Sequence, residues 1–364
     1  MKDFIPEEIF IERAVSGSNL AGGITKKFPR SKIFEISGFK DYLRLFSPAL
    51  SINKAKKRLY IAKQKGSFLK PCPGTSGYLC CNYYILNIGF GCFYDCSYCY
   101  LQSYLNFPGI ILYANIEDFF RQIDISLKKN PRLFYRLGTG EFTDSLAFER
   151  IFSYAGELVP FFSNKRIMLE LKTKSDYVEN LLNLNHGGST AISWSLNPPG
   201  IIRNEEKGSL SLKKRLKAAR ACARAGYPIG FHFDPIIIYS GWQEDYQGTI
   251  QEIFKYVSKE NLCWISLGTL RFSPGLKEII ARRFPKTKII YEEFITGLDG
   301  KMRYFKPKRV EIYRKMLSWI KEFAPEVPVY LCMESRDVWR KVFGFSPRDP
   351  REVEKLFKIK KWLN

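Results

Sequence analysis

The chain has 364 residues, 45% of them hydrophobic, which is enough for one large domain or a core domain with extensions. Its 58 Lys and Arg residues against 36 Asp and Glu give a formal net charge of +22, which favours a polyanionic partner, nucleic acid before a membrane surface. An even spread of charge that serves solubility is the alternative. No run of 18 apolar residues and no signal-peptide core are present, so we expect a cytoplasmic protein without a membrane partner.

The predicted elements begin with a mixed N-terminal region. It has short strands at 9–11 and 33–36, a strongly basic segment at 54–65 and a Pro-Gly turn at 70–74. From residue 83 onward, apolar segments alternate with amphipathic ones. Strands are predicted at 83–88, 133–137, 167–171, 191–196, 228–235 and 262–267, and helices at 116–129, 144–158, 212–225 and 246–257. This alternation predicts a parallel sheet covered by helices, as a barrel or as a doubly wound sheet.

Beyond about residue 272 the regular alternation ends. A β-hairpin is predicted around the Gly-Leu-Asp-Gly turn at 297–300, followed by a helix over 308–323 and a last strand over 327–332. The basic segments 54–65 and 301–309 would suit a phosphate backbone. Tyr304 and Phe305 would then stack on a base or wedge beside it, and a hairpin that only faces solvent is the alternative.

The most specific motif directly follows the strand predicted at 83–88. Cys92, Cys96 and Cys99 have the spacing C-x3-C-x2-C, and nine cysteines in a reducing compartment indicate metal binding or catalysis more than disulfides. Thiolates are the usual protein ligands of iron–sulfur clusters, and three of them leave one iron of a [4Fe–4S] cluster open to a small molecule. A zinc site or buried structural cysteines are the alternatives, but zinc usually takes four ligands in paired C-x2-C form.

With its aromatic residue before the last cysteine, this loop resembles the signature loop of the radical S-adenosylmethionine (SAM) enzymes. Its continuation, Tyr98-Cys99-Tyr100-Leu101-Gln102, looks more specifically like the spore photoproduct lyase family of DNA-repair enzymes. Further matches at 224–227, 241–242 and 283–286 extend the resemblance over most of the chain. It implies a [4Fe–4S] cluster on Cys92, Cys96 and Cys99, SAM on the open iron, and cleavage of SAM to a 5′-deoxyadenosyl radical that abstracts hydrogen from the substrate. An electron donor such as flavodoxin or ferredoxin is the implied protein partner.

The resemblance also implies an α/β fold, a partial (β/α)6 TIM-type radical SAM barrel. We expect an N-terminal basic extension over 1–82 that packs on the barrel, the barrel core over 83–272, and a C-terminal elaboration with hairpin, helix and strand over 273–364. In a parallel barrel, residues that contact ligands follow the carboxyl ends of the strands.

Those strand ends carry the candidate SAM-binding residues. Gly138 and Gly140 let the backbone approach a ligand closely and resemble the glycine-rich motif that holds the methionine amine, although an ordinary strand-to-helix turn is the alternative. By resemblance, Thr143, Lys174 and Ser195 match residues that contact SAM, and Asp234 is a weaker candidate for an adenosine hydroxyl. The predicted set is Tyr98, Gly138, Gly140, Glu141, Thr143, Lys174, Ser195 and Asp234. His232 is typical of a hydrogen-bonded core histidine.

Glu141 is a departure from the family. Aligned on Thr143-Asp144, it occupies the position of the cysteine that returns a hydrogen atom to the product radical in spore photoproduct lyases, and glutamate has no weak bond to hydrogen. Tyr98 and Tyr100 match tyrosines beside the lyase's hydrogen-transfer path. Cys332, at the end of the last strand, is the spare thiol predicted to donate, with a buried apolar cysteine as the alternative. The predicted catalytic residues are Tyr98, Tyr100, Glu141 and Cys332.

The favoured hypothesis is a radical SAM lyase that repairs a thymine-dimer-type lesion in DNA by cleaving the carbon–carbon bond between the bases. A radical SAM enzyme that modifies RNA or another substrate, favoured by Glu141, is one alternative. A non-catalytic iron–sulfur protein that binds nucleic acid is the other. Cys72, Cys80 and Cys81 form a second cysteine group, for which the sequence allows an auxiliary cluster or structural thiols.

Overall fold

A curled sheet of eight strands forms the centre of the computed structural model, which describes residues 4–45, 52–72, 74–75, 77–104, 109–129 and 134–357. The strand order is β18-β14-β13-β11-β10-β9-β5-β4. Seven strands run parallel, and β4 (Leu69–Pro71) pairs antiparallel with β5 at the edge. The parallel strands are β5 (Tyr83–Leu86), β9 (Tyr135–Gly138), β10 (Ile167–Thr173), β11 (Thr190–Ser195), β13 (Ile229–Ile236), β14 (Leu262–Thr269) and β18 (Val329–Leu331). Residue 133 of the strand predicted at 133–137 lies outside the described residues.

The sheet is concave enough for opposite strands to touch across its inner face. Arg136 on β9 donates to the hydroxyl of Tyr330 on β18 at 3.1 Å, although four strands separate β9 from β18 in the sheet. Glu170 on β10 completes the contact, with an ion pair of 2.8 Å to Arg136 and a 2.6 Å contact to His232 on β13. The predicted α/β half-barrel is therefore confirmed.

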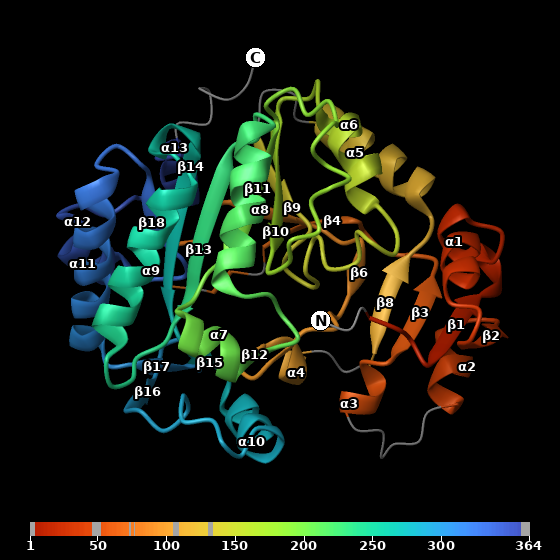
Figure 1. Ribbon diagram of the computed structural model, residues 1–364, viewed down its shortest axis with the longest axis horizontal. Helices are drawn as coiled ribbons and strands as arrows, with labels where there is room; N and C mark the ends of the chain where they lie inside the picture. The colour runs from red at the N-terminus through yellow and green to blue at the C-terminus, as the bar shows by residue number, and fades with distance from the viewer. Residues whose placement is uncertain are drawn as a thin grey trace.

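Helices cover the convex face of this sheet (Figure 1). Helix α8 buries Leu212, Leu216 and Cys222 and exposes lysines on the opposite side, as its period predicts. The main helices are α5 (Ile116–Lys129), α6 (Tyr154–Phe162), α7 (Pro199–Glu205), α8 (Leu212–Arg224), α9 (Trp242–Tyr256), α10 (Pro274–Arg283) and α11 (Lys306–Phe323). Shorter ones are α2 (Phe39–Arg44), α3 (Ile52–Ala55), α4 (Leu101–Tyr104), α12 (Arg336–Phe343) and α13 (Pro350–Lys355).

The helix predicted over 144–158 is wrong in its first part. The Asp144 carboxylate accepts from the Thr173 hydroxyl at 2.6 Å and from the Lys174 N–H at 2.7 Å, and the Ser145 N–H donates to the Lys172 carbonyl. These side-chain and backbone bonds hold the segment against β10 as turns, because they compete with helical hydrogen bonds. The helix, α6, starts only at Tyr154, where the Ser153 hydroxyl accepts from the Gly156 N–H.

A second sheet, with the order β2-β1-β3-β8-β6, lies beside the barrel (Figure 1). Its strands are β1 (Glu8–Glu12), β2 (Lys32–Ile36), β3 (Arg58–Ala62), β8 (Ile110–Tyr113) and β6 (Gly89–Phe90), and α1 (Asn19–Lys27) connects β1 to β2. Strands β6 and β8 flank the cysteine loop, so the N-terminal strands extend the sheet from which that loop emerges. The loop is thereby anchored by both sheets.

The C-terminal elaboration contains the predicted hairpin. Strands β16 (Phe294–Thr296) and β17 (Met302–Tyr304) pair antiparallel, and β15 (Arg271–Phe272) pairs with β17. The hairpin, α4, α7 and α10 gather at the end of the barrel where the strands finish (Figure 1). In the part of the chain that the structure describes, no helix is long and apolar enough to cross a membrane.

Candidate active site

The three-cysteine loop is held by cations from two distant segments. The Lys56 ammonium donates to the carbonyls of Cys92, at 3.2 Å, and Tyr94, and pairs with the Asp95 carboxylate at 3.2 Å. The Arg283 guanidinium contacts both oxygens of Asp95 at 2.9 and 3.1 Å. Strand β7 (Asp95–Cys96) also pairs antiparallel with β12 (Glu206–Lys207). The loop backbone is therefore fixed from several sides.

The thiols of this loop fit an iron–sulfur cluster. Cys92, Cys96 and Cys99 are free, and burial raises the pKa of the Cys92 thiol and that of Cys96, the latter to about 12. Both thiols therefore hold their protons until a metal displaces them. Among the described residues, no three His, Cys, Asp or Glu side chains are arranged around a single metal ion. A [4Fe–4S] cluster binds each thiolate to a different iron, so the three thiols of the C-x3-C-x2-C loop would leave one iron open.

The phenol of Tyr98 belongs to a buried polar network beside this loop. Its hydroxyl donates to the Glu206 carboxylate, which also accepts from Asn197 at 2.9 Å and pairs with the fully buried Arg215. Burial alone would raise the pKa of Glu206, but the Arg215 and Lys174 cations lower it to about 2. Arg215 also donates to the Ser195 carbonyl at 2.8 Å, so this network fixes the end of β11.

Several predicted SAM-binding residues lie around the cysteine loop. The Thr143 hydroxyl donates to the Gly91 carbonyl at 2.7 Å, and the Lys174 ammonium lies 5.8 Å from the centre of the Tyr98 ring. Gly138 and Gly140 are closely packed: an added Cβ would lie 2.0 Å from the Tyr83 hydroxyl or 2.8 Å from the Lys172 Cβ, respectively. The glycines therefore allow a close backbone approach that no other residue permits.

Three of the four predicted catalytic residues fall into two contacts, apart from Tyr98 in its Glu206 network. The Tyr100 hydroxyl donates to the Glu141 carbonyl at 2.9 Å and to its carboxylate at 3.1 Å. Cys332 instead lies beside the ion pair of Asp234 and Arg271, with 3.6 Å from its sulfur to the guanidinium. Burial and the neighbouring Asp234 carboxylate raise the pKa of the Cys332 thiol, so it keeps its hydrogen at neutral pH.

A family model described as spore photoproduct lyase matches residues 74–330. The chain belongs to the spore photoproduct lyase family. The spore photoproduct lyase of Bacillus subtilis is 28% identical over 256 residues, which cover 68% of this chain and 75% of that protein. The Clostridium acetobutylicum spore photoproduct lyase is 24% identical over 260 residues, 71% and 73% of the two chains.

Solved spore photoproduct lyase structures superpose over almost the whole chain. One, complexed with dinucleoside spore photoproduct, has a TM-score of 0.80 at 26% identity and covers 91% of this chain and 100% of its own. A doubly substituted variant with bound AdoMet and dinucleoside spore photoproduct has a TM-score of 0.80 at 25% identity and covers 92% and 100%. Family membership confirms the predicted enzyme class, a radical SAM lyase, and its cofactors, a [4Fe–4S] cluster and SAM.

Sequence reasoning missed the charged interior of this spore photoproduct lyase family barrel. Arg136, Glu170, Ser193, His232 and Tyr330 form an inner polar group, in which Glu170 accepts from Ser193 at 2.7 Å. His232 is thus a hydrogen-bonded core residue, as predicted. Glu206, Arg215 and Arg271 were not singled out either. Arg271 is a charge beside an apolar segment, which is a weak signal, whereas Glu206 and Arg215 stand among other charged residues and have no distinguishing signal.

The second cysteine group is in mutual contact at the amino end of β5. The Cys80 thiol interacts with those of Cys72 and Cys81, and Cys81 also interacts with the Tyr330 hydroxyl. Cys72 and Cys81 pack on the cluster of Tyr83, Ile85 and Phe142. Their role as ligands of an auxiliary cluster stays a prediction.

Several cations of the segments 54–65 and 301–309, which were predicted to contact a phosphate backbone, are engaged inside the protein. Lys56 holds the cysteine loop, and Arg303 and Arg309 are buried in ion pairs with Asp299 and Glu334. Tyr304 is buried, so the prediction that it stacks on a base is wrong, because its ring packs against Phe294 under the hairpin. Phe305 is exposed, and its stacking on a base stays a prediction.

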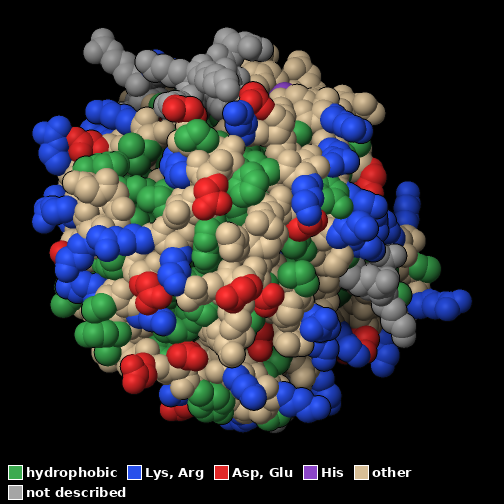
Figure 2. Space-filling view, turned by 60° about the vertical axis from the view of Figure 1, so that its left-hand side comes forward, with side chains coloured by type: hydrophobic (Ala, Val, Ile, Leu, Met, Phe, Trp, Pro, Cys, Tyr) green, Lys and Arg blue, Asp and Glu red, His purple; other side chains and the backbone are tan. Residues whose placement is uncertain are grey.

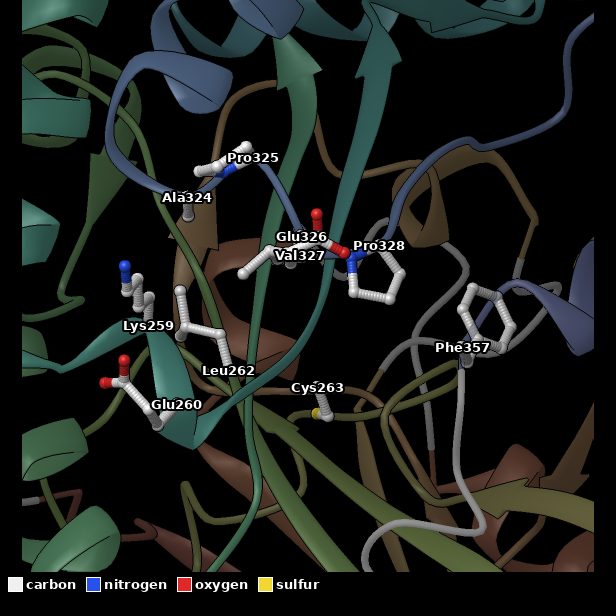
Figure 3. A pocket seen from close by; sticks show the side chains of 10 residues that line it. All are labelled: Lys259, Glu260, Leu262, Cys263, Ala324, Pro325, Glu326, Val327, Pro328 and Phe357. Atoms are coloured by element: carbon white, nitrogen blue, oxygen red, sulfur yellow. The ribbon is translucent and has the colours of Figure 1, made fainter.

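A hollow of about 290 Å³ lies at the other end of the barrel (Figure 3). Leu262, Cys263, Val327, Pro328 and Phe357 are among the residues that line it. Leu262 and Cys263 begin β14, Val327 and Pro328 directly precede β18, and Phe357 follows α13, whereas the cysteine loop and the candidate ligand residues follow the strand ends. This hollow is therefore separate from the active site.

Proposed function

We propose that the protein repairs a spore-photoproduct-type thymine lesion in DNA by cleaving the carbon–carbon bond that joins the two bases. The observation that carries this proposal is the three-cysteine loop at the mouth of a half-barrel that superposes on a lyase holding both AdoMet and dinucleoside spore photoproduct. The lesion must leave the base stack to reach such a mouth.

The chain's own residues bind and orient the reactants. Cys92, Cys96 and Cys99 hold the cluster, which together with SAM supplies the one-electron chemistry that produces an organic radical. The backbone at Gly138 and Gly140 receives the methionine amine, and Lys174 neutralises the methionine carboxylate. Tyr98, Thr143, Ser195 and Asp234 complete the proposed SAM-binding set. Glu141, also predicted for this set, lies next to Lys172 and is left for the substrate. The Glu206 and Arg215 pair keeps Tyr98 in place.

We assign the return of hydrogen to Cys332, since Glu141 has no suitable hydrogen. Its S–H bond would break as a C–H bond of the product forms, beside the Asp234 and Arg271 pair. Because thiol hydrogens exchange with solvent, the wild-type protein in D2O should place deuterium in the repaired thymine. Cys332→Ala should lose this label, while Cys263→Ala, at the opposite end of β14, should keep it. Equal labelling in Cys332→Ala would exclude this thiol as the donor.

DNA binding is supported by the net charge of +22 and by the hairpin at the barrel mouth. Figure 2 shows Lys and Arg spread over one face rather than gathered in one patch, so the charges on that face do not mark a DNA-binding site. At the hairpin, Ile295, Leu298 and Phe305 are 43%, 90% and 53% exposed. Exposed apolar side chains at this place suit the gap left by an extruded base.

The electron donor is proposed to dock beside the cysteine loop. A hollow of about 570 Å³ is lined there by Phe93 of the loop, by Phe4 and by the cations Lys27, Arg30 and Arg150, and no acidic residue is among the described residues that line it. Such a lining complements an acidic carrier such as flavodoxin or ferredoxin. The predicted cytoplasmic location would keep the cluster and this carrier reduced.

Reversing one charge tests this docking site. Arg30→Glu should slow SAM cleavage driven by reduced flavodoxin and leave cleavage driven by dithionite unchanged. Lys213→Glu, on the exposed face of α8, is the matched control. Equal flavodoxin-driven rates in Arg30→Glu and the wild-type protein would place the donor elsewhere.

Glu141 favours a second candidate, a radical SAM enzyme that modifies RNA or another substrate. The two candidates differ in SAM use: a lyase that recycles its radical forms many repaired lesions for each 5′-deoxyadenosine, whereas a modifying enzyme forms one 5′-deoxyadenosine for each product. Counting both species by chromatography after anaerobic turnover on lesion-bearing DNA tests the proposal. Stoichiometric 5′-deoxyadenosine with an intact lesion would favour the second candidate.

A further inference from the structure

Side chains two residues apart on a strand point to the same face of the sheet. The residue two positions after each member of the inner polar group therefore lies on the same face, closer to the strand end. These next residues form a mouth group: Gly138, Lys172, Ser195, Asp234 and, after the end of β18, Cys332. Lys172 follows Glu170 on β10, and Glu170 faces the interior because it contacts Arg136 and His232. The Lys172 ammonium therefore faces the interior of the half-barrel, between the inner polar group and the mouth.

Glu141 lies next to Lys172. A Cβ on Gly140 would lie 2.8 Å from the Lys172 Cβ, so the loop after β9 crosses directly over the lysine stem. Burial alone would lower the pKa of Lys172, but the carboxylates of Glu141, Glu170 and Asp234 outweigh burial and raise it. Lys172 is therefore a cation, and both it and Glu141 are partly exposed rather than sealed in the core.

Lys172 and Glu141 also keep free hydrogen-bonding capacity. Glu170 is engaged by Arg136 and His232, and Asp234 by Arg271. Within the described part of the chain, the Lys172 ammonium makes no hydrogen bond and has no carboxylate within 4.0 Å. Only one Glu141 carboxylate oxygen has a hydrogen-bond partner there, the Tyr100 hydroxyl. The Lys172 ammonium and the Glu141 carboxylate thus lie near each other without forming an ion pair.

A flat group that presents an acceptor beside a donor fits between them. The imide edge of a thymine ring has this pattern, with a carbonyl oxygen next to the N3–H. We propose that Lys172 donates to a ring carbonyl and Glu141 accepts from the N3–H of one thymine of the lesion. This inference rests on the proposed function, and it gives Glu141 a role as a recognition residue in the position where related lyases carry a hydrogen-donating cysteine.

Binding of dinucleoside spore photoproduct to the reconstituted protein with SAM, measured by calorimetry, tests this pair. Lys172→Met and Glu141→Leu should each weaken binding about tenfold, since each removes a hydrogen bond to a charged group. Methylating N3 of both thymines should weaken binding to the wild-type protein by a similar factor and have little further effect on Glu141→Leu. Lys315→Met, on the outer helix α11, is the matched control.

The outcomes separate this inference from the proposed function. One outcome would overturn the recognition pair alone. The wild-type protein would bind the lesion, and neither Lys172→Met nor N3-methylation of the lesion would change the affinity. Wild-type protein that holds SAM and does not bind the lesion would overturn the proposed substrate and the pair with it. If a variant does not fold, comparing the two lesions on the wild-type protein still decides the matter.

Discussion

Replacing Glu206 by glutamine should destabilise the protein by about 3 kcal/mol at neutral pH. Glutamine keeps the shape of the side chain but leaves the Arg215 guanidinium, which is 0% exposed, without its anion. Breaking a buried pair in this way costs about 3–5 kcal/mol. The pKa gives the same scale: burial would raise it, but the Arg215 and Lys174 cations lower the pKa of Glu206 from 4.5 to about 2, which corresponds to about 3 kcal/mol.

The pH dependence of this effect has a definite sign. Because the pKa of Glu206 is lower in the folded state, its contribution is complete above pH 4.5 and is lost as the pH falls through about 2. The difference between wild-type protein and Glu206→Gln should therefore shrink to about half by pH 3. Urea unfolding of the iron-free protein, followed by circular dichroism at several pH values, measures it.

Glu35→Gln is the control for this experiment. Glu35 pairs with Arg13 at 3.0 Å on the surface, where both side chains are more than half exposed, and its loss should cost less than about 1 kcal/mol. A Glu206→Gln cost as small as that of Glu35→Gln, or one that grows in acid, would refute the reasoning.

Three further changes have expected outcomes. Gly138→Ala should weaken SAM binding and lower the melting temperature, because its methyl group would lie 2.0 Å from the Tyr83 hydroxyl. The control Gly248→Ala, on α9 with nothing within 4 Å of the added Cβ, should be neutral or slightly stabilising. Calorimetry checks both variants. Cys96→Ala should lose most of the bound iron, counted after anaerobic reconstitution, and an unchanged iron count would place the cluster elsewhere. Lys56→Met should speed the loss of iron to a chelator, because two carbonyls of the loop lose their donor and Asp95 keeps only Arg283 as a partner cation. An unchanged rate would contradict the anchoring role of Lys56.

The features that the sequence predicted well are local ones. Helix α5 has the predicted bounds because its apolar period runs uninterrupted from Ile116 to Lys129. The cysteine spacing is equally local, and the binding of the cluster by Cys92, Cys96 and Cys99 stays a prediction. The parallel strands follow from continuously apolar segments, since both faces of such a sheet are covered.

The features that could not be predicted depend on contacts between distant segments. Residues 144–153 have a helical pattern, but the Asp144 side chain bonds to β10 and prevents the helix. Nothing in the sequence links Lys172 to Glu141 or Glu206 to Tyr98. The loop after β9 crosses over Lys172 on β10, and the pairing of β12 with β7 brings Glu206 beside Tyr98. The sequence also could not distinguish the buried Tyr304 from the exposed Phe305, which are adjacent residues.

The most direct test is repair of a defined lesion by the reconstituted protein. The protein with its cluster, SAM and a reductant would be incubated without oxygen with an oligonucleotide that carries one spore photoproduct, and the digested DNA analysed by chromatography with mass detection. We expect the lesion to be converted to two thymidines by the wild-type protein, and not by a variant in which Cys92, Cys96 and Cys99 are alanine. Cleavage of SAM by the wild-type protein with the lesion left intact would contradict the proposed repair function.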